Sequence, residues 1–176
     1  MRADYLYADM WGHVLAALMP PNQLALRVSQ ATGLRIGDVL NLRTEQLRSH
    51  PDGRLTVREE KTGKTRRIRI PRQLMDEMIA QAGKIWIWEG RTNYRQHRSR
   101  QAVYKDLKRA ARLFRLGPLQ ISPHTARKIY AVSKFHQTGS VQRVQQLLCH
   151  SSEAVTMLYA MADQLTERKR KGGRSA

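Results

Sequence analysis

The strongest constraint on the fold is one stretch in which apolar and polar residues alternate. Residues 55–59 and 66–70 both follow this pattern, which is typical of β-strands with one buried face. Residues 61–64, Lys-Thr-Gly-Lys, lie between them and have the composition of a turn. We therefore predict an antiparallel hairpin. We also expect a short strand near 46–48, turning at 51–53, to add a third strand to the sheet.

Elsewhere the apolar residues recur at helical spacing. Leu6, Met10, Val14 and Leu18 show this spacing first, and similar patterns follow along the chain. Proline and glycine residues separate the patterns and mark the helix ends. The helices predicted in this way cover residues 5–18, 20–31, 36–42, 72–81, 100–114, 124–136 and 140–148, and a last helix contains Tyr159. The predicted fold class is α+β, predominantly α-helical, with a small three-stranded antiparallel sheet at one edge.

Composition indicates a single domain with a polyanionic partner. The chain has 176 residues, of which 41% are hydrophobic, and this is enough for one core. Lys and Arg number 32 and Asp and Glu number 14, so the net charge is +18. A charge this large points first to nucleic acid and second to an anionic membrane surface. Residues 1–176 are expected to form one domain, in which 165–176 are a flexible basic tail.

Other classes of protein are disfavoured by the same sequence. No apolar run approaches the roughly 18 residues that a membrane-spanning helix needs, and the first residues lack the apolar segment of a secretory signal peptide. Cys149 is the only cysteine, so no intrachain disulfide is possible and a cysteine-based zinc site is disfavoured. A reducing, cytoplasmic location fits these features best.

Arg35 is the first candidate for binding a phosphate. Leu34 and Ile36 flank it with apolar side chains, which would anchor a tight junction between two helices and hold the guanidinium at the edge of the core. A guanidinium can bind a phosphate with two hydrogen bonds. Asp38, three residues on, is placed to orient it. The alternative is a purely structural ion pair between Arg35 and Asp38.

Lys61, His124 and Arg127 are further candidates for contact with DNA. Lys61 opens the predicted turn and could reach into a DNA groove, although most turn lysines are merely solvated. His124 and Arg127 are three residues apart and share one face of a predicted helix, so both can touch one phosphate. The alternative for this pair is a capping histidine and a surface arginine.

The last candidate pair is His150 and Tyr159, nine residues apart. Ser151 and Ser152 follow the histidine, and either can cap the helix that carries the tyrosine. For Tyr159 the alternative is an aromatic side chain at the edge of the core.

In their order and spacing, these motifs resemble those of the tyrosine recombinases, the phage-integrase family. The matching segments are Gly-Leu-Arg with an acidic residue three positions on, the hairpin Lys-Thr-Gly-Lys, His-x-x-Arg, and Leu-Cys-His-Ser-Ser with a tyrosine nine residues after its histidine. Cys149 replaces the glycine of the family pattern, which would permit a positive φ or close packing. The resemblance runs from about residue 35 to 159 and implies a tyrosine-recombinase-like catalytic domain.

The resemblance also implies a role for each residue. The arginines would bind the scissile phosphate with Asp38 in support, the hairpin lysine would be the general acid, and the tyrosine would be the nucleophile. Lys64 is a weaker candidate for the role of the general acid. The implied catalytic set is Arg35, Lys61, His124, Arg127, His150 and Tyr159.

Together these groups meet the needs of phosphodiester cleavage without a metal. Two arginines and a histidine can neutralise the charge on the non-bridging oxygens. A tyrosine hydroxyl has a pKa of about 10, so it needs a base or a cationic field to attack at neutral pH. His124 could accept its proton, Arg35 and Arg127 could supply the field, and Lys61 could protonate the leaving oxygen. The product would be a covalent 3′-phosphotyrosine, and no metal or cofactor is implied.

Double-stranded DNA is the partner that this chemistry requires. Residues 91–100 are predicted as a basic loop, and the polar side of the helix over 100–114 carries more cations. A charged helix face is often only solvated, which is the alternative here. The candidate DNA contacts are Lys64, Arg95, Arg98, Arg100, Lys105, Lys108, Arg109 and Arg112. Many phosphate contacts would make the affinity fall steeply with salt.

An assembly is implied as well. Family recombinases act as tetramers on two DNA sites, often by exchanging the C-terminal segment. We therefore expect a homotetramer on DNA that is weakly associated or monomeric without it, with residues 160–176 as the candidate exchanged segment. Only 34 residues precede Arg35, so we expect no N-terminal core-binding domain.

The leading function is site-specific DNA recombination or integration in the cytoplasm, in association with the nucleoid. Two alternatives stay open: a type IB topoisomerase-like enzyme, which uses the same nucleophile, and a non-catalytic basic DNA-binding regulator. A covalent DNA adduct at Tyr159 separates both catalytic functions from the regulator.

Overall fold

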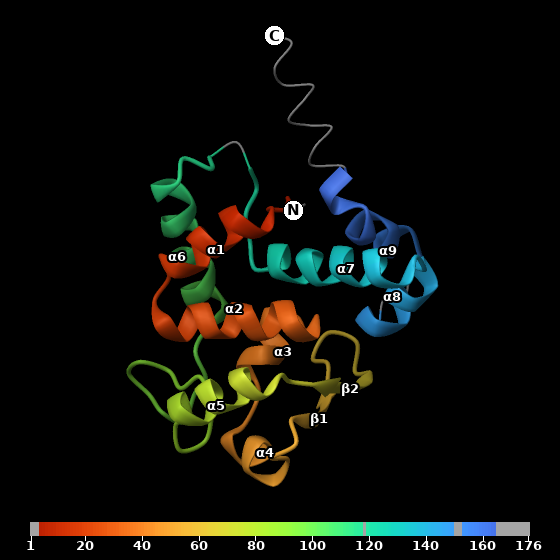
Figure 1. Ribbon diagram of the computed structural model, residues 1–176. Helices are drawn as coiled ribbons and strands as arrows, with labels where there is room; N and C mark the ends of the chain where they lie inside the picture. The colour runs from red at the N-terminus through yellow and green to blue at the C-terminus, as the bar shows by residue number, and fades with distance from the viewer. Residues whose placement is uncertain (1–3, 118, 150–152, 165–176) are drawn as a thin grey trace.

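The computed structural model describes residues 4–117, 119–149 and 153–164 (Figure 1). In chain order the elements are α1 (Ala8–Ala16), α2 (Pro20–Thr32), α3 (Ile36–Leu40), α4 (Thr44–Ser49), β1 (Arg54–Arg58), β2 (Thr65–Arg69), α5 (Arg72–Gln81), α6 (Arg100–Leu113), α7 (His124–Thr138), α8 (Val141–Leu148) and α9 (Glu153–Ala160). The predominantly helical α+β class is confirmed. None of the described helices is long and apolar enough to cross a membrane.

The sheet is smaller than predicted, because it has two strands within the described residues. β1 and β2 pair antiparallel, with 54–58 opposite 65–69. The expected third strand near 46–48 was wrong, since these residues lie in α4. The side chain of Gln46 accepts a 2.9 Å hydrogen bond from the backbone N–H of Arg43 and so caps the start of a helix. This local bond favours a helical turn over an extended strand.

α2 is the central helix of the fold. It contacts α7 on one side and α3 and α5 on the other, and α1 packs beside it. In Figure 1 the strands, α4 and α5 accordingly lie below α2, α1, α7 and α9 lie above it, and α8 lies to its right at about the same height. Trp11 and Trp88 are buried in this core. Their ring N–H groups donate to the Gln30 side chain at 2.8 Å and to the Pro21 carbonyl at 2.9 Å, which satisfies them away from water.

The junction between α2 and α3 is a sharp turn at Gly33. This glycine ends α2 with φ 69° and ψ 13°, the left-handed conformation that glycine adopts without strain. The hydroxyl of Ser29 donates to the carbonyl of Leu34 at 2.7 Å, and the Leu34 side chain is fully buried. The chain leaves the turn with Arg35 at the N-cap of α3.

A second, smaller core joins α7, α8 and α9. It is built from the buried side chains of Tyr130, Ala131, Val144 and Leu148, and Tyr159 packs against it. Each of the three helices contacts the other two. Their packing returns the chain toward the first turn of α7 and carries Tyr159 to that place.

Candidate active site

Arg35 is held at the N-terminus of α3 by the buried Leu34 beside it. Its guanidinium is partly exposed, and Nη1 donates a 2.5 Å hydrogen bond to Oε2 of Glu59. Within the described part of the chain, the ion pair of Arg35 is with Glu59. The alternative of a structural ion pair between Arg35 and Asp38 is therefore wrong, because the hairpin brings a different carboxylate, Glu59, to the arginine.

Arg127 lies in the first turn of α7 and is only 1% exposed. Nη2 donates to the carbonyl of Leu148 at 2.6 Å, and Nη1 donates to the carbonyl of Gly33. Burial and the nearby charges of Arg35 and Arg66 lower the pKa of Arg127 to about 10, so it stays charged at neutral pH. The alternative of a surface arginine is wrong, since this side chain is built into the core.

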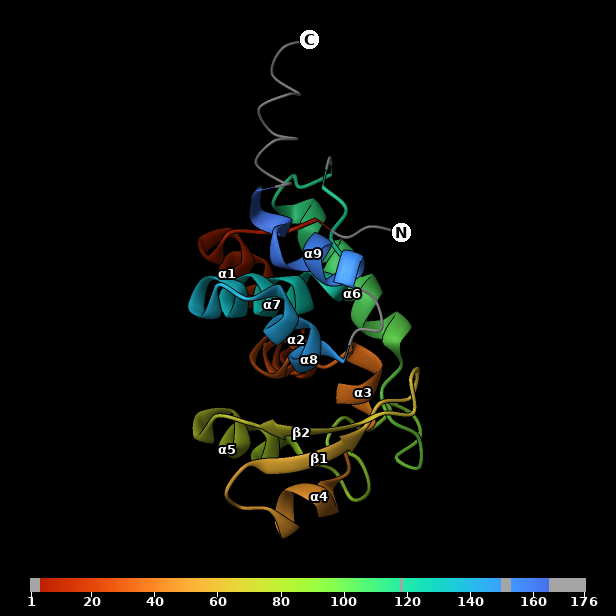
Figure 2. The ribbon, with the colours of Figure 1, turned by 90° about the vertical axis from the view of Figure 1, so that its right-hand side faces the viewer.

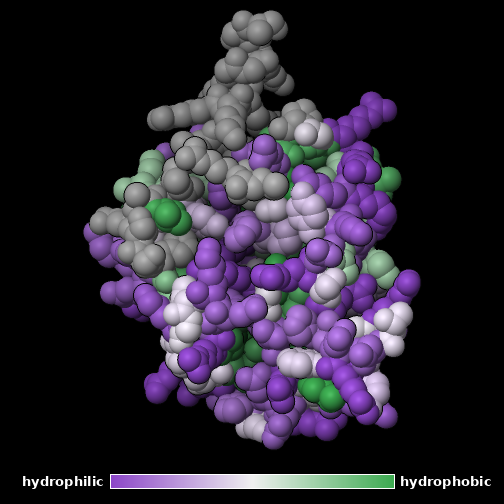
Figure 3. Space-filling view, turned by 180° about the vertical axis from the view of Figure 1, so that it is seen from behind, coloured by the Kyte–Doolittle hydropathy of each residue, from purple (hydrophilic) through white to green (hydrophobic). Residues whose placement is uncertain are grey.

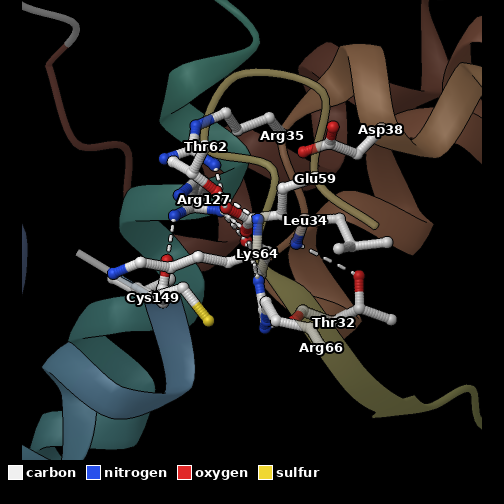
Figure 4. Close-up of polar contacts among 12 residues, drawn as sticks. Thr32, Leu34, Arg35, Asp38, Glu59, Thr62, Lys64, Arg66, Arg127 and Cys149 are labelled. Atoms are coloured by element: carbon white, nitrogen blue, oxygen red, sulfur yellow. Dashed lines mark hydrogen bonds and ion pairs between the residues drawn. The ribbon is translucent and has the colours of Figure 1, made fainter. Parts of the chain in front are cut away.

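Glu59 is a site residue that the sequence analysis missed. Its side chain is 0% exposed and meets three arginines from different segments. Oε1 lies 3.5 Å from Nη1 of Arg66 and 3.9 Å from Nη1 of Arg127, and Oε2 bonds Arg35. In Figure 4 these three guanidiniums surround the carboxylate. The signal was present, because the alternation of β1 and β2 puts Glu59 and Arg66 in phase with buried apolar residues.

Asp38 contributes to the hairpin rather than to Arg35 directly. Its Oδ1 accepts a 2.9 Å hydrogen bond from the backbone N–H of Glu60. Oδ2 is buried without a hydrogen-bond partner among the residues that the structure describes. Burial raises the pKa of Asp38, and the charge of Glu59 raises it further, against the opposing effects of the Glu60 bond and the charges of Arg35 and Arg127.

A pocket of about 250 Å³ brings the candidate residues together. Arg35, Lys61, His124 and Arg127 all line it, as does Arg100. Lys61 is exposed on the hairpin turn. These residues come from α3, the hairpin, α7 and α6, so the pocket exists only in the folded chain.

Tyr159 lies beside this pocket and contacts His124. The phenolic oxygen and Nδ1 of His124 are 3.2 Å apart, a distance at which a neutral imidazole protonated on Nε2 accepts a hydrogen bond from the tyrosine. The ammonium of Lys128 lies 5.4 Å from the centre of the Tyr159 ring. His150, the remaining predicted catalytic residue, lies outside the described residues.

The surroundings set the protonation of this pair. Loss of solvent, and then the charges of Arg127, Arg35, Lys61 and Lys128, lower the pKa of His124. Burial raises the pKa of Tyr159, and this outweighs the lowering by Arg127 and Arg35. In the DNA-free protein the pKa of Tyr159 therefore lies above its ordinary value despite the two nearby arginines.

The pocket opens on one hydrophilic face of the molecule. α3, α6 and the hairpin turn lie together along the right-hand side of Figure 2. Figure 3 looks onto this face, which is largely hydrophilic with small, scattered apolar patches. A polyanion approaching this side would meet the pocket.

The sequence matches a model of the phage integrase family over residues 7–165. The chain belongs to the phage integrase family. The resemblance seen in the motifs is thus confirmed over most of the chain.

Relatives within the phage integrase family differ considerably in sequence. Tyrosine recombinase XerA of Pyrococcus furiosus is 28% identical over 144 residues, which are 78% of this chain and 49% of XerA. The chain therefore spans about half the length of that relative. The crystal structure of a lambda integrase (75–356) dimer bound to a COC′ core site has a TM-score of 0.74 at 23% identity and covers 91% of this chain and 60% of that chain. The crystal structure of a lambda integrase tetramer bound to a Holliday junction has a TM-score of 0.69 at 23% identity. It covers 90% of this chain and 48% of that chain. The likeness to both structures establishes the fold.

Cys149 occupies the glycine position of the phage integrase motif. Its φ is 50° and its ψ is 36°, so it adopts the left-handed conformation at the end of α8. Glycine would adopt this conformation without strain, whereas a residue with a Cβ is strained there. The strained turn directly follows Leu148, whose carbonyl holds Arg127.

The candidate DNA contacts divide into two groups. Lys105, Lys108, Arg109 and Arg112 line a groove of about 560 Å³ along α6. Lys64, Arg95 and Arg100 are exposed as well. Two of the predicted contacts are also engaged within the fold. Arg98 donates to the Asn22 side chain at 2.6 Å, and Arg109 donates to Asp106 at 2.7 Å and to the Ala17 carbonyl at 2.6 Å.

Proposed function

We propose that this chain breaks and rejoins DNA strands at specific sites through a covalent 3′-phosphotyrosine at Tyr159. The observation that carries the proposal is the 3.2 Å contact between the Tyr159 hydroxyl and His124, beside a pocket lined by Arg35 and Arg127. A nucleophile, a proton acceptor and two cations are what metal-free phosphoryl transfer requires.

In the first step the Tyr159 oxygen attacks the scissile phosphorus. A bond forms between this oxygen and phosphorus, and the phenolic proton passes to Nδ1 of His124. The lowered pKa of His124 keeps the imidazole neutral and able to accept the proton. The pKa of Tyr159 is raised, so in the DNA-free protein the hydroxyl carries its proton and needs an acceptor in order to attack.

The arginines stabilise the charge that develops on the phosphate. Arg35 is partly exposed at the pocket and can bind the non-bridging oxygens directly. Arg127 acts from the pocket wall, where burial strengthens its field. His150 is proposed as a further hydrogen-bond donor to the same oxygens.

The leaving group is the 5′-oxygen of the cleaved strand. As the bond between phosphorus and this oxygen breaks, Lys61 protonates the oxygen to give a free 5′-hydroxyl. A 5′-hydroxyl from a second strand then attacks the phosphotyrosine and gives its proton to Lys61. The bond between phosphorus and the Tyr159 oxygen breaks, and His124 returns the proton to that oxygen. The number of phosphodiester bonds is conserved, so no external energy source is needed.

The partners follow from this chemistry. We propose double-stranded DNA as substrate and a homotetramer on two DNA sites as the active assembly, weakly associated or monomeric without DNA. Two lambda integrase structures with the same fold, a dimer on a core site and a tetramer on a Holliday junction, support this. Such an enzyme would act in the cytoplasm, at the nucleoid.

The test is to trap the covalent intermediate. The protein is incubated with nicked duplexes taken from the DNA that flanks its gene, and the reaction is quenched in detergent. A protein–DNA adduct should form with the wild-type protein and with the control Tyr7→Phe, whose ring lies on the surface, and it should be absent from Tyr159→Phe. Tight, salt-sensitive DNA binding without any adduct would instead indicate a non-catalytic regulator.

A further inference from the structure

Glu59 is the one carboxylate within the described residues that contacts Arg35, Arg66 and Arg127 together. The three cations belong to α3, β2 and α7. Arg66 is only 6% exposed and is also anchored to the backbone, since Nη2 donates to the carbonyl of Thr32 at 2.8 Å. In Figure 4 Arg66 lies below the carboxylate and Arg35 lies above it, and Arg35 is also one of the residues that line the pocket.

The same carboxylate also holds the turn that carries Lys61. The hydroxyl of Thr62 donates a 2.8 Å hydrogen bond to Oε2, the oxygen that Arg35 also contacts. The backbone adds two hydrogen bonds of 2.9 Å. The N–H of Glu59 donates to the carbonyl of Lys64, and the N–H of Gly63 donates to the carbonyl of Glu59. Three residues of the turn, Thr62, Gly63 and Lys64, are therefore each hydrogen-bonded to Glu59.

Stability alone does not explain such a cluster. A buried ion pair often contributes no more to stability than well-packed apolar side chains would. Burial by itself would raise the pKa of Glu59, but the hydrogen bonds from Thr62 and Arg35 and the charges of Arg35 and Arg127 outweigh it, so the pKa lies below its ordinary value. The group is therefore ionised at neutral pH and binds its partners as a charge.

We propose that Glu59 is a positioning residue. It holds Arg35 and the turn that carries Lys61 in the relative positions from which both reach the scissile phosphate. The proposal rests on the function proposed above. Oε2 accepts hydrogen bonds from both the phosphate-binding arginine and the turn hydroxyl, so one carboxylate oxygen sets the position of each group. Correct placement of the general acid relative to the phosphate is worth a large factor in rate, since small displacements are costly in phosphoryl transfer.

The first variant is Glu59→Gln, which keeps the shape and one acceptor oxygen but removes the charge. DNA affinity should stay within about threefold of wild type, and the single-turnover cleavage rate should fall by roughly 10- to 100-fold. Thermal unfolding checks that the variant is folded. A folded variant that cleaves at the wild-type rate would overturn the proposal.

The second variant, Thr62→Val, removes only the turn hydroxyl on the protein surface and does not depend on the stability of the buried cluster. Thr62→Ser restores the hydroxyl. Thr65→Val makes the same chemical change at an exposed position at the start of β2. Thr62→Val loses the bond to Glu59 and also the longer 3.3 Å bond that the hydroxyl accepts from the backbone N–H of Lys64. We expect its cleavage to fall by roughly three- to tenfold, while both other variants cleave as wild type does.

A modified substrate then separates positioning from general structural damage. In a 5′-bridging phosphorothiolate, the bond between phosphorus and sulfur breaks and sulfur leaves with the electron pair as a thiolate, which needs no proton because thiol pKa values are about 8.5. On this substrate Thr62→Val and the control Lys61→Ala should cleave within about twofold of wild type, whereas Arg35→Ala should stay impaired. A Thr62→Val defect of equal size on both substrates would overturn the proposal.

The wild-type protein, measured on both substrates, distinguishes failure of this proposal from failure of the proposed function. If the wild type forms no Tyr159-dependent adduct with either substrate, the proposed function is wrong, and the role of Glu59 in that reaction is wrong with it. If wild type cleaves both substrates and the Thr62→Val pattern is absent, only the role of Glu59 is refuted.

Discussion

Tyr159 and His124 form a pair whose surroundings adjust both pKa values for proton transfer. Burial raises the pKa of the phenol more than Arg127 and Arg35 lower it. Loss of solvent and then the same two arginines, followed by Lys61, lower the pKa of the imidazole. At neutral pH the proton is therefore on the tyrosine and the histidine is free to accept it, which is what general-base catalysis needs.

This arrangement predicts the pH dependence of cleavage. A lowered pKa means that His124 is protonated only below its ordinary value of 6.5. At subsaturating DNA, where the rate reports the pKa of the free protein, the cleavage rate should stay nearly constant as the pH falls to 6.5 and decline only below it, and His124→Ala should lack this decline. The measurement is a rate profile with one trapped substrate. A wild-type rate already halved at or above pH 6.5 would contradict the assignment.

The same shift has a consequence for folding. Between the lowered folded pKa and the ordinary value of 6.5, the unfolded chain binds a proton at His124 more readily than the folded chain does. This contribution to stability is therefore present above pH 6.5 and is lost as the pH falls through the folded pKa.

Cys149 is strained in its left-handed conformation, with φ 50°. Cys149→Gly should raise the free energy of unfolding by about 0.5–1 kcal/mol, because the cost of a Cβ in this region exceeds the entropy that glycine loses on folding. Denaturant unfolding measures the change. Cys149→Ala keeps the Cβ and should bring no gain, and equal gains in both variants would show that the sulfur, not φ, is responsible.

At the scale of elements, the junction of α2 and α3 determines where the arginines meet. Gly33 turns the chain with φ 69°, and its carbonyl accepts hydrogen bonds from Arg127 and, at 3.3 Å, from Arg66. The same turn places Arg35 at the start of α3. One short turn thus supports three cations of the site.

Gly33→Ala should damage this junction. A Cβ at this position would lie 2.6 Å from two ring carbons of Tyr130, and φ would be strained as well. We expect a loss of about 1–3 kcal/mol in the free energy of unfolding and slower cleavage. Gly12→Ala in α1 is the control, since nothing lies within 4 Å of its Cβ and alanine favours a helix. Equal effects of the two substitutions would refute the role of the turn.

At the scale of the whole molecule, the net charge of +18 favours a polyanionic partner such as the proposed DNA. α6 turns its cations toward the groove beside it, and the start of α6 reaches the pocket through Arg100. A duplex that lies along α6 could therefore enter the candidate site.

This geometry predicts the salt dependence of DNA affinity. Lys105→Ala, Lys108→Ala and Arg112→Ala should each reduce the slope of log affinity against log salt by about one, because each neutralised phosphate releases counterions. Arg48→Ala in α4, at the far end of the molecule in Figure 1, should leave the slope unchanged. Fluorescence anisotropy across a salt series measures all four, and an equal change in the Arg48 variant would indicate a nonspecific charge effect.

The sequence by itself determined the local structure and the chemical inventory. The period of the apolar residues predicted the helices and the hairpin, because burial of one face depends on spacing alone. The order of the motifs indicated the family and named Arg35, Lys61, His124, Arg127 and Tyr159. The prediction of a third strand was wrong because the side chain of Gln46 caps the start of a helix, α4, and this outweighs a weak extended pattern.

Only the tertiary structure decided which groups are partners. Arg35 has Asp38 three residues away and Glu59 twenty-four residues away, and it pairs with the second. Sequence distance cannot resolve this, because the choice depends on how the hairpin packs against α3 and α7. The buried charge of Glu59, the contact of Tyr159 with His124 and the opposed shifts in their pKa values all arise from that packing, since burial and proximity exist only once distant segments meet.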